Sequence, residues 1–126
     1  MSARILIIED EPAIRELIQV NLSHAGFEVV SAEYASEGKR EIDYRLPDLI
    51  LLDVMMPGLS GFDVLEQIRV EKNNQLREVP IMMITAKSQS EDVDRALELG
   101  ATGYIVKPFR QAKFIEKVNL LLGIEG

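Results

Sequence analysis

The alternation of short apolar runs with longer amphipathic stretches constrains the fold of this chain most strongly. The apolar runs are Ile5–Ile8, Glu28–Ser31, Leu49–Leu52, Ile81–Ile84 and Tyr104–Val106. Three of these runs are almost entirely apolar rather than alternating, which is typical of parallel strands that are covered by helices on both faces. Strands that alternate with helices in this way predict a doubly wound α/β fold.

Each stretch between the runs carries signals that start or stop a helix. The expected helices run from Pro12 to a stop at Gly26, from a cap at Ser36 to about Arg45, onward from a cap at Ser60, from Ser88 to a stop at Gly100, and from about Arg110 to Leu122. Proline suits a first helical turn, and Ser88 with Glu91 forms a capping box. The polar stretch Glu71–Glu78 is the best candidate for a mobile surface loop.

Length and composition indicate one soluble, cytoplasmic domain. The chain has 126 residues and no cysteine, which excludes disulfides and thiolate metal sites. Before Glu9 it offers Arg4 followed by a run of four apolar residues, Ile5–Ile8, which is too short for the core of a secretory signal. No unbroken run of large apolar residues exceeds four, so we expect no membrane span.

The formal net charge of −7 argues against direct binding of this domain to nucleic acid. Binding to a phosphate backbone needs clustered lysine and arginine side chains, which this composition does not favour. Solubility explains most of the acidic residues. The cluster Glu9–Glu11 requires a separate explanation because it follows a predicted buried strand.

Polar and charged residues stand where four of the five predicted strands end. Glu9 and Asp10 follow the first strand, Asp53 follows the third, Thr85 the fourth and Lys107 the fifth. In open parallel sheets, ligands bind beyond the carboxyl ends of the strands. Any one of these residues alone would be an ordinary cap, strand former or surface charge, but their gathering at one edge of the sheet indicates a site.

Three carboxylates at one edge require a compensating charge. Two unit charges ~4 Å apart repel by about 4 kcal/mol at an effective dielectric constant near 20, and a whole domain is stable by only ~5–15 kcal/mol. A single lysine cannot neutralise three acids, whereas Mg²⁺ readily binds carboxylates, water and phosphate oxygens. The acids would then hold the metal, one of them could act as a nucleophile, and Lys107 and Thr85 could bind an incoming anion.

These motifs resemble the receiver domain of two-component response regulators. The resemblance rests on EDE at 9–11, LLDVMMPG at 51–58, TA at 85–86 and KP at 107–108, and it extends from Arg4 to about Leu122. It implies a single receiver domain over residues 1–126, with a flavodoxin-like (βα)5 three-layer sandwich and strand order 2-1-3-4-5. The stretch RILIIEDEPAIRELI is similar to the winged-helix subfamily of phosphate-regulon and osmoregulation type.

The resemblance implies a phosphoacceptor and a metal site. Asp53 matches the residue that takes a phosphoryl group from a phosphohistidine on a sensor histidine kinase. Asp10 and Asp53 match the carboxylates that ligate Mg²⁺, for which Mn²⁺ can substitute. Glu9 matches an acid that binds the ion through water, and the backbone carbonyl of Met55 matches the main-chain ligand. The domain is expected to be a signalling domain and not an enzyme, with at most slow Mg²⁺-dependent self-phosphorylation and self-dephosphorylation.

The resemblance also implies residues that bind the phosphoryl group. The Thr85 hydroxyl and the Lys107 amine match groups that contact its oxygens. Ala86 matches a position kept small so that its N–H can approach the phosphate, and Met55 matches a neighbouring position in this site. The peptide bond between Lys107 and Pro108 matches one that is usually cis in the family.

A conformational switch is the expected output. Thr85 would move to the phosphoryl group and Tyr104 would turn inward, which changes the surface of the fourth helix, the fifth strand and the fifth helix. This surface would control an output domain or partner protein, or form a homodimer on phosphorylation. Thr102-Gly103 stands where winged-helix relatives often carry an acidic pair, and KFIEKVNLLL lacks their arginine. The sequence therefore leaves the output class, the oligomeric state and the cognate kinase open.

Three other functions compete with this interpretation. A Mg²⁺-dependent phosphatase of the aspartyl-nucleophile type needs a second acid two residues after the nucleophile, where this chain has Met55. A nucleotide- or flavin-binding module needs a glycine- or hydroxyl-rich loop after the first strand, where this chain has acids. A degenerate receiver would lack Asp53, Thr85 or Lys107.

In the receiver family that these motifs resemble, Met55 and Lys87 match positions that tune the lifetime of the phosphoryl group.

Overall fold

Strands and helices alternate along the computed structural model, which describes residues 2–56, 58–86 and 90–124. The strands are β1 (Arg4–Ile8), β2 (Glu28–Ala32), β3 (Leu49–Asp53), β4 (Ile81–Thr85) and β5 (Gly103–Val106). The helices are α1 (Pro12–His24), α2 (Ala35–Tyr44), α3 (Gly61–Arg69), α4 (Asn74–Arg77), α5 (Ser90–Glu98) and α6 (Gln111–Leu122). None of the described helices is long and apolar enough to cross a membrane.

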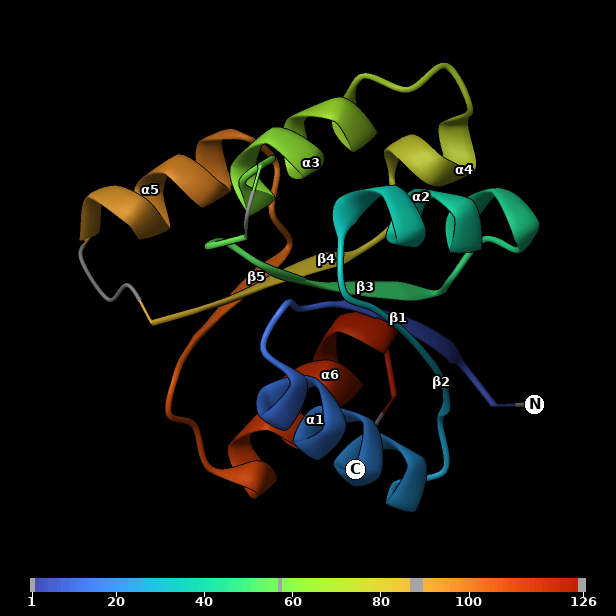
Figure 1. The fold of residues 1–126 in the computed structure, drawn as a ribbon, viewed down its shortest axis with the longest axis vertical. Helices are drawn as coiled ribbons and strands as arrows, with labels where there is room; N and C mark the ends of the chain where they lie inside the picture. The colour runs from blue at the N-terminus through green and yellow to red at the C-terminus, as the bar shows by residue number, and fades with distance from the viewer. Residues whose placement is uncertain (1, 57, 87–89, 125–126) are drawn as a thin grey trace.

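The strands form one parallel sheet in the order β2-β1-β3-β4-β5. Figure 1 shows α1 and α6 on one face of the sheet and α2, α3 and α5 on the other. The predicted doubly wound three-layer sandwich is therefore confirmed, including the strand order that the resemblance supplied. Asp53 lies on the central strand, β3.

The core has two parts, one on each face of the sheet, because successive side chains of a strand point to opposite faces. Leu6 and Ile50 belong to the cluster on one face, while Ile5 and Leu49 belong to the cluster on the other. Every residue of β1 and β3 is buried. Burying one such side chain contributes roughly 1.5–3 kcal/mol, so these strands hold the residues at their ends in fixed positions.

The prediction that Ser36 caps the second helix is wrong by two residues. Tyr34 occupies the N-cap position and makes no side-chain cap hydrogen bond. The buried Gly38 packs against β1, and a Cβ atom at this position would lie 2.8 Å from Cγ1 of Ile8. The N–H of Gly38 donates to the Tyr34 carbonyl at 3.1 Å, so the first turn of α2 begins at Tyr34 and places Gly38 against β1.

The prediction of a loop over Glu71–Glu78 is wrong for its central part. Asn74–Arg77 forms α4, one helical turn. The side-chain oxygen of Asn73 accepts hydrogen bonds from the backbone N–H groups of Gln75 at 2.9 Å and Leu76 at 3.3 Å. Leu76 packs against the core, so this turn is anchored at both its cap and its apolar side chain.

The cap predicted at Ser60 is confirmed. Its Oγ accepts a hydrogen bond from the N–H of Asp63 at 3.3 Å, and the Asp63 carboxylate accepts one from the N–H of Ser60 at 3.2 Å. For the capping box predicted at Ser88 and Glu91, Ser88 lies outside the described residues. Lys87 lies outside them as well.

Candidate functional site

Three carboxylates meet at the C-terminal edge of the sheet. Glu9 directly follows β1, Asp10 opens the loop to α1, and Asp53 ends β3. In the pairing of these two strands, Ile8 lies opposite Leu52, which brings the next residues of both strands together. Each acid offers an oxygen within 4.8 Å of the others. The structure thus brings together the three acids that the strand ends predicted to be neighbours.

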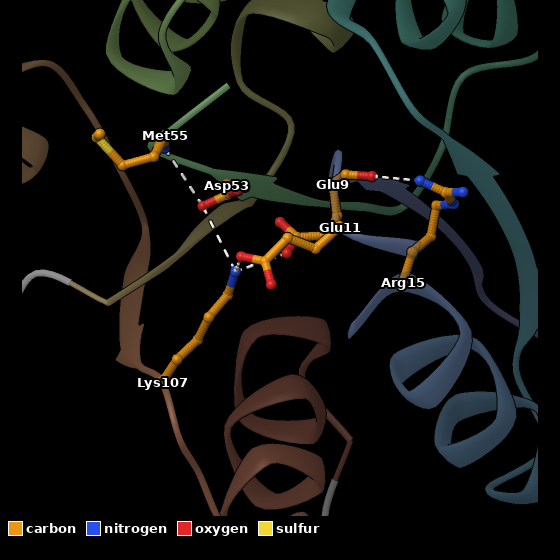
Figure 2. A network of polar contacts seen from close by, with 6 residues as sticks. All are labelled: Glu9, Glu11, Arg15, Asp53, Met55 and Lys107. Atoms are coloured by element: carbon orange, nitrogen blue, oxygen red, sulfur yellow. Dashed lines mark hydrogen bonds and ion pairs between the residues drawn. The ribbon is translucent and has the colours of Figure 1, made fainter. Parts of the chain in front are cut away.

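Lys107 joins this cluster from the end of β5. Its Nζ lies 2.6 Å from Oε1 of Glu9, 3.6 Å from Oε1 of Glu11 and 3.8 Å from Oδ1 of Asp53 (Figure 2). Burial lowers the pKa of Lys107, but these three carboxylates outweigh that effect and leave the pKa raised. The amine is therefore positively charged and centred among the acids.

Burial changes the chemistry of Asp53 strongly, since only 3% of its surface is exposed. Burial and the neighbouring Glu9 raise the pKa of Asp53 from 3.8 to about 8, against the opposing effects of Lys107 and the Met55 N–H. The folded state then holds a proton that the unfolded state has released. As the pH rises from the unfolded-state pKa of 3.8 to the folded-state pKa of about 8, the contribution of Asp53 to the free energy of unfolding consequently falls.

Two carboxylate oxygens of the cluster lack a hydrogen-bond partner within the described residues. They are Oε2 of Glu9 and Oδ1 of Asp10, and both are buried. An unpaired buried carboxylate oxygen is costly, and Lys107 already contacts the other oxygen of Glu9. Such a set of oxygens fits a hard divalent cation such as Mg²⁺, which is bound by oxygen ligands.

The remaining predicted residues surround the acids on β4 and β5. Thr85, fully buried, ends β4, and its carbonyl accepts a hydrogen bond from the Lys107 N–H at 2.7 Å. Ala86 follows it and is exposed. Burial raises the pKa of Tyr104 on β5, while a hydrogen bond with the Thr85 side chain acts in the opposite direction. The peptide bond between Lys107 and Pro108 is cis, as the resemblance implies.

Met55 contacts Asp53 through its backbone N–H, and its side chain points to solvent. Its N–H donates a hydrogen bond to Oδ1 of Asp53 at 3.3 Å, as Figure 2 shows. The side chain is 59% exposed. The structure thus places Met55 beside the acid cluster, and its role as a main-chain metal ligand stays a prediction.

Two residues of the site have roles that the sequence alone did not indicate. Glu11 contacts Lys107, and Arg15 donates a hydrogen bond from Nη1 to the backbone carbonyl of Glu9 at 2.8 Å. The helix start at Pro12 could have indicated the second contact. Side chains in the first turn of a helix point back toward its N-terminus, which places Arg15 near the loop before α1.

We expect Asp10→Asn to stabilise the metal-free domain by about 1 kcal/mol, because it removes one charge from the acid cluster. The same substitution should weaken Mg²⁺ binding. Chemical denaturation with and without Mg²⁺ measures both effects, and Asp43→Asn, an exposed position on α2, serves as the control. An unchanged or lower stability without Mg²⁺ would show that Lys107 already offsets the repulsion.

Comparison with known proteins identifies the domain type. The family model described as the response regulator receiver domain matches residues 5–119. The phosphate regulon transcriptional regulatory protein PhoB of Escherichia coli K12 is 38% identical over 122 residues, which cover 97% of this chain and 52% of PhoB. The alkaline phosphatase synthesis transcriptional regulatory protein PhoP of Bacillus subtilis is 38% identical over 97% of this chain and 49% of PhoP. The chain thus spans about half the length of these relatives.

Solved structures agree with this result. The chemotaxis protein CheY4 of Vibrio cholerae has a TM-score of 0.89 and 29% identity, with 96% of this chain and 99% of that chain covered. The receiver domain of the sensor histidine kinase PA1611 from Pseudomonas aeruginosa PAO1 has a TM-score of 0.86 and 28% identity, with 98% and 99% covered. That structure holds a magnesium ion coordinated in its active-site cleft.

Proposed function

We propose that this chain, which belongs to the response regulator receiver domains, accepts a phosphoryl group on Asp53 from the phosphohistidine of a sensor histidine kinase. The observation that carries this proposal is the position of Asp53. It is a buried carboxylate at the end of β3, 3.8 Å from the Lys107 amine and clustered with Glu9 and Asp10. Receiver domains are signalling phosphoacceptors and not conventional enzymes.

In the proposed transfer, a cation held by the acids would favour the ionised form of Asp53, and a carboxylate oxygen of this residue would attack the phosphorus atom. The bond from phosphorus to the donor imidazole nitrogen breaks as the new oxygen–phosphorus bond forms, and the histidine leaves. Such transfer depends mainly on positioning and charge neutralisation. The rigid end of β3 supplies the position, and the Lys107 ammonium pairs with the negative charge of the phosphoryl oxygens.

The acid cluster would hold Mg²⁺, or Mn²⁺ in its place. Asp10, Asp53 and the backbone carbonyl of Met55 would be ligands, with Glu9 acting through water. The bound ion supplies charge neutralisation for the carboxylate and the phosphoryl group. The unpaired buried oxygens of Glu9 and Asp10 support this assignment.

The output of phosphorylation would be a switch at the surface of α5, β5 and α6. The Thr85 hydroxyl would move toward a phosphoryl oxygen, the Ala86 N–H and the neighbouring Met55 position would complete its binding, and Tyr104 would turn inward. This surface would contact an output domain, a partner protein or a second copy of the chain in the cytoplasm. Because PhoB and PhoP are transcriptional regulatory proteins, gene regulation is the output that the comparisons support best.

A phosphatase function is disfavoured by the residue that follows the acceptor. Met55 occupies the place where a general acid would be needed, and a thioether cannot transfer a proton. The phosphorylated Asp53 should therefore persist and not turn over rapidly. Self-dephosphorylation would be slow at most.

A small-molecule acyl phosphate tests the proposed function. With Mg²⁺ present, intact-mass spectrometry should show one phosphoryl adduct per chain, whereas chelation of the metal should abolish the adduct because the buried acids then repel the phosphoryl group. An adduct that forms equally well without Mg²⁺ would contradict the metal assignment. Rapid turnover of a phosphomonoester would favour the phosphatase function instead.

A further inference from the structure

Arg15 binds the backbone of the acidic loop from the side opposite Lys107. It is the fourth residue of α1, and its Nη1 donates to the Glu9 carbonyl at 2.8 Å. Figure 2 shows the two cations on either side of Glu9: Lys107 points at the carboxylates, and Arg15 points at the main chain. No step of the proposed transfer uses Arg15.

The Glu9 carbonyl is the group whose direction sets the course of the loop. The N–H of Glu9 bonds to the carbonyl of Ala32 at 3.1 Å, at the end of the β1–β2 pairing. The carbonyl of Glu9 belongs to the planar peptide unit that continues to Asp10. A hydrogen bond from Arg15 to this oxygen therefore fixes the plane from which the Asp10 side chain departs.

The loop needs the hydrogen bond from Arg15 because its contacts with Lys107 would change during the proposed reaction. Lys107 contacts Glu9 and Glu11 in the structure, but it would pair with the phosphoryl group after transfer. The N-cap residue Glu11 makes no side-chain cap hydrogen bond. The Arg15 side chain contacts only the main chain of Glu9, so this hydrogen bond can persist before and after phosphoryl transfer.

We infer that Arg15 is a positioning residue, which holds the Glu9–Asp10 peptide so that both carboxylates face Asp53. This inference rests on the proposed function and adds a residue that the comparisons do not assign. Arg15 touches neither Asp53 nor the phosphoryl group, and acts on the metal-binding acids through the loop. Outer partners of this kind typically change metal affinity about 10–100-fold when they are removed.

The sign of the effect separates positioning from simple electrostatics. If Arg15 acted only through its charge, removing it should tighten Mg²⁺ binding, because the repulsion between the guanidinium and the metal ion would be lost. Loss of a positioning hydrogen bond should weaken it, because the two carboxylates are no longer held toward Asp53. The two explanations predict opposite changes in Mg²⁺ affinity for the same variant.

The experiment uses Arg15→Met, which keeps the length of the aliphatic stem but removes the donor and the charge. Arg40→Met is the matched control, because Arg40 is exposed on α2 and makes no side-chain hydrogen bond or ion pair within the described part of the chain. Calorimetric titration with Mg²⁺ should show a dissociation constant about tenfold higher for Arg15→Met than for wild type. Arg40→Met should match wild type.

A second readout is the rate of phosphorylation by a small-molecule acyl phosphate as a function of Mg²⁺ concentration. For Arg15→Met, the Mg²⁺ concentration giving half the maximal rate should rise by the same factor, while the rate at saturating Mg²⁺ should return to the wild-type value. Circular dichroism melts confirm that the variant is folded. If it is not, Arg15→Gln replaces it, because glutamine is helix-compatible and too short to reach the carbonyl in the same way.

Equal or tighter Mg²⁺ binding by a folded Arg15 variant would overturn the inference. So would a lower rate at saturating Mg²⁺ with unchanged affinity, which would indicate a direct role in the chemistry. Failure of the proposed function gives a different result: the wild-type chain would then bind no Mg²⁺ or form no adduct. The two failures are therefore distinguishable in one set of measurements.

Discussion

Asp53→Asn will carry no phosphoryl group after incubation with Mg²⁺ and a small-molecule acyl phosphate, whereas the wild-type chain will carry one. The substitution keeps the size of the side chain but replaces the nucleophilic carboxylate with an amide, which is a poor nucleophile and a weaker metal ligand. The expected effect is complete loss of the adduct in intact-mass spectra. The fold should survive, because asparagine has the same shape as the buried Asp53 side chain and, like its protonated form, carries no charge.

Asp43→Asn is the control for this loss. Asp43 is exposed on α2, and the substitution makes the same replacement of aspartate by asparagine with the same change in mass. This variant should be phosphorylated as the wild type is. An adduct of equal yield on Asp53→Asn would show that another residue accepts the phosphoryl group.

Gly61→Ala should destabilise the domain by about 3 kcal/mol or more and reduce phosphorylation. Gly61 opens α3, and its N–H donates to the Val54 carbonyl at 2.8 Å. An added Cβ would collide with the carbonyl oxygen of Asp53 and lie 2.9 Å from the Cα of Val54. These are backbone atoms that cannot rotate away, so α3 must move from the end of β3 and shift Asp53.

Gly26→Ala provides the comparison, because it tests alanine at a glycine without the collision. Gly26 has a φ of 94° and would place no atom within 4 Å of an added Cβ. Its cost should be limited to the strain of a left-handed residue, about 1–2 kcal/mol. Chemical denaturation of both variants measures the difference. Equal losses would show that α3 and the end of β3 are not packed as closely as the structure indicates.

The arrangement of the acids was predictable from the sequence because it follows from the sheet. In a parallel sheet the carboxyl ends of all strands lie at one edge, so the residue after each apolar run is placed without knowledge of the loops. Glu9 and Asp53 follow two strands that pair directly. Lys107 reaches them from the edge strand β5 because its side chain is long, which a pattern of strand ends can suggest but cannot establish.

Contacts between residues far apart in the sequence were not predictable in the same way. The start of α2 is associated with the packing of Gly38 on Ile8 and not with the cap signal of Ser36. Arg69 of α3 donates to the carbonyls of Gly100 at 2.8 Å and Val79 at 2.7 Å. A charge near the end of a helix is usually solvated, and only the packing of α3 against these two turns reveals this role.

Locating the phosphoryl group at a single residue tests the central claim most directly. Borohydride reduces an acyl phosphate to an alcohol, so a phosphorylated aspartate becomes homoserine, which peptide mass spectrometry can place in the sequence. After treatment with the acyl phosphate, Mg²⁺ and then borohydride, we expect homoserine at position 53 of the wild-type chain. Position 10 should remain aspartate. Homoserine at position 10, or an unreduced Asp53 in phosphorylated chain, would contradict the assignment of Asp53 as the phosphoacceptor.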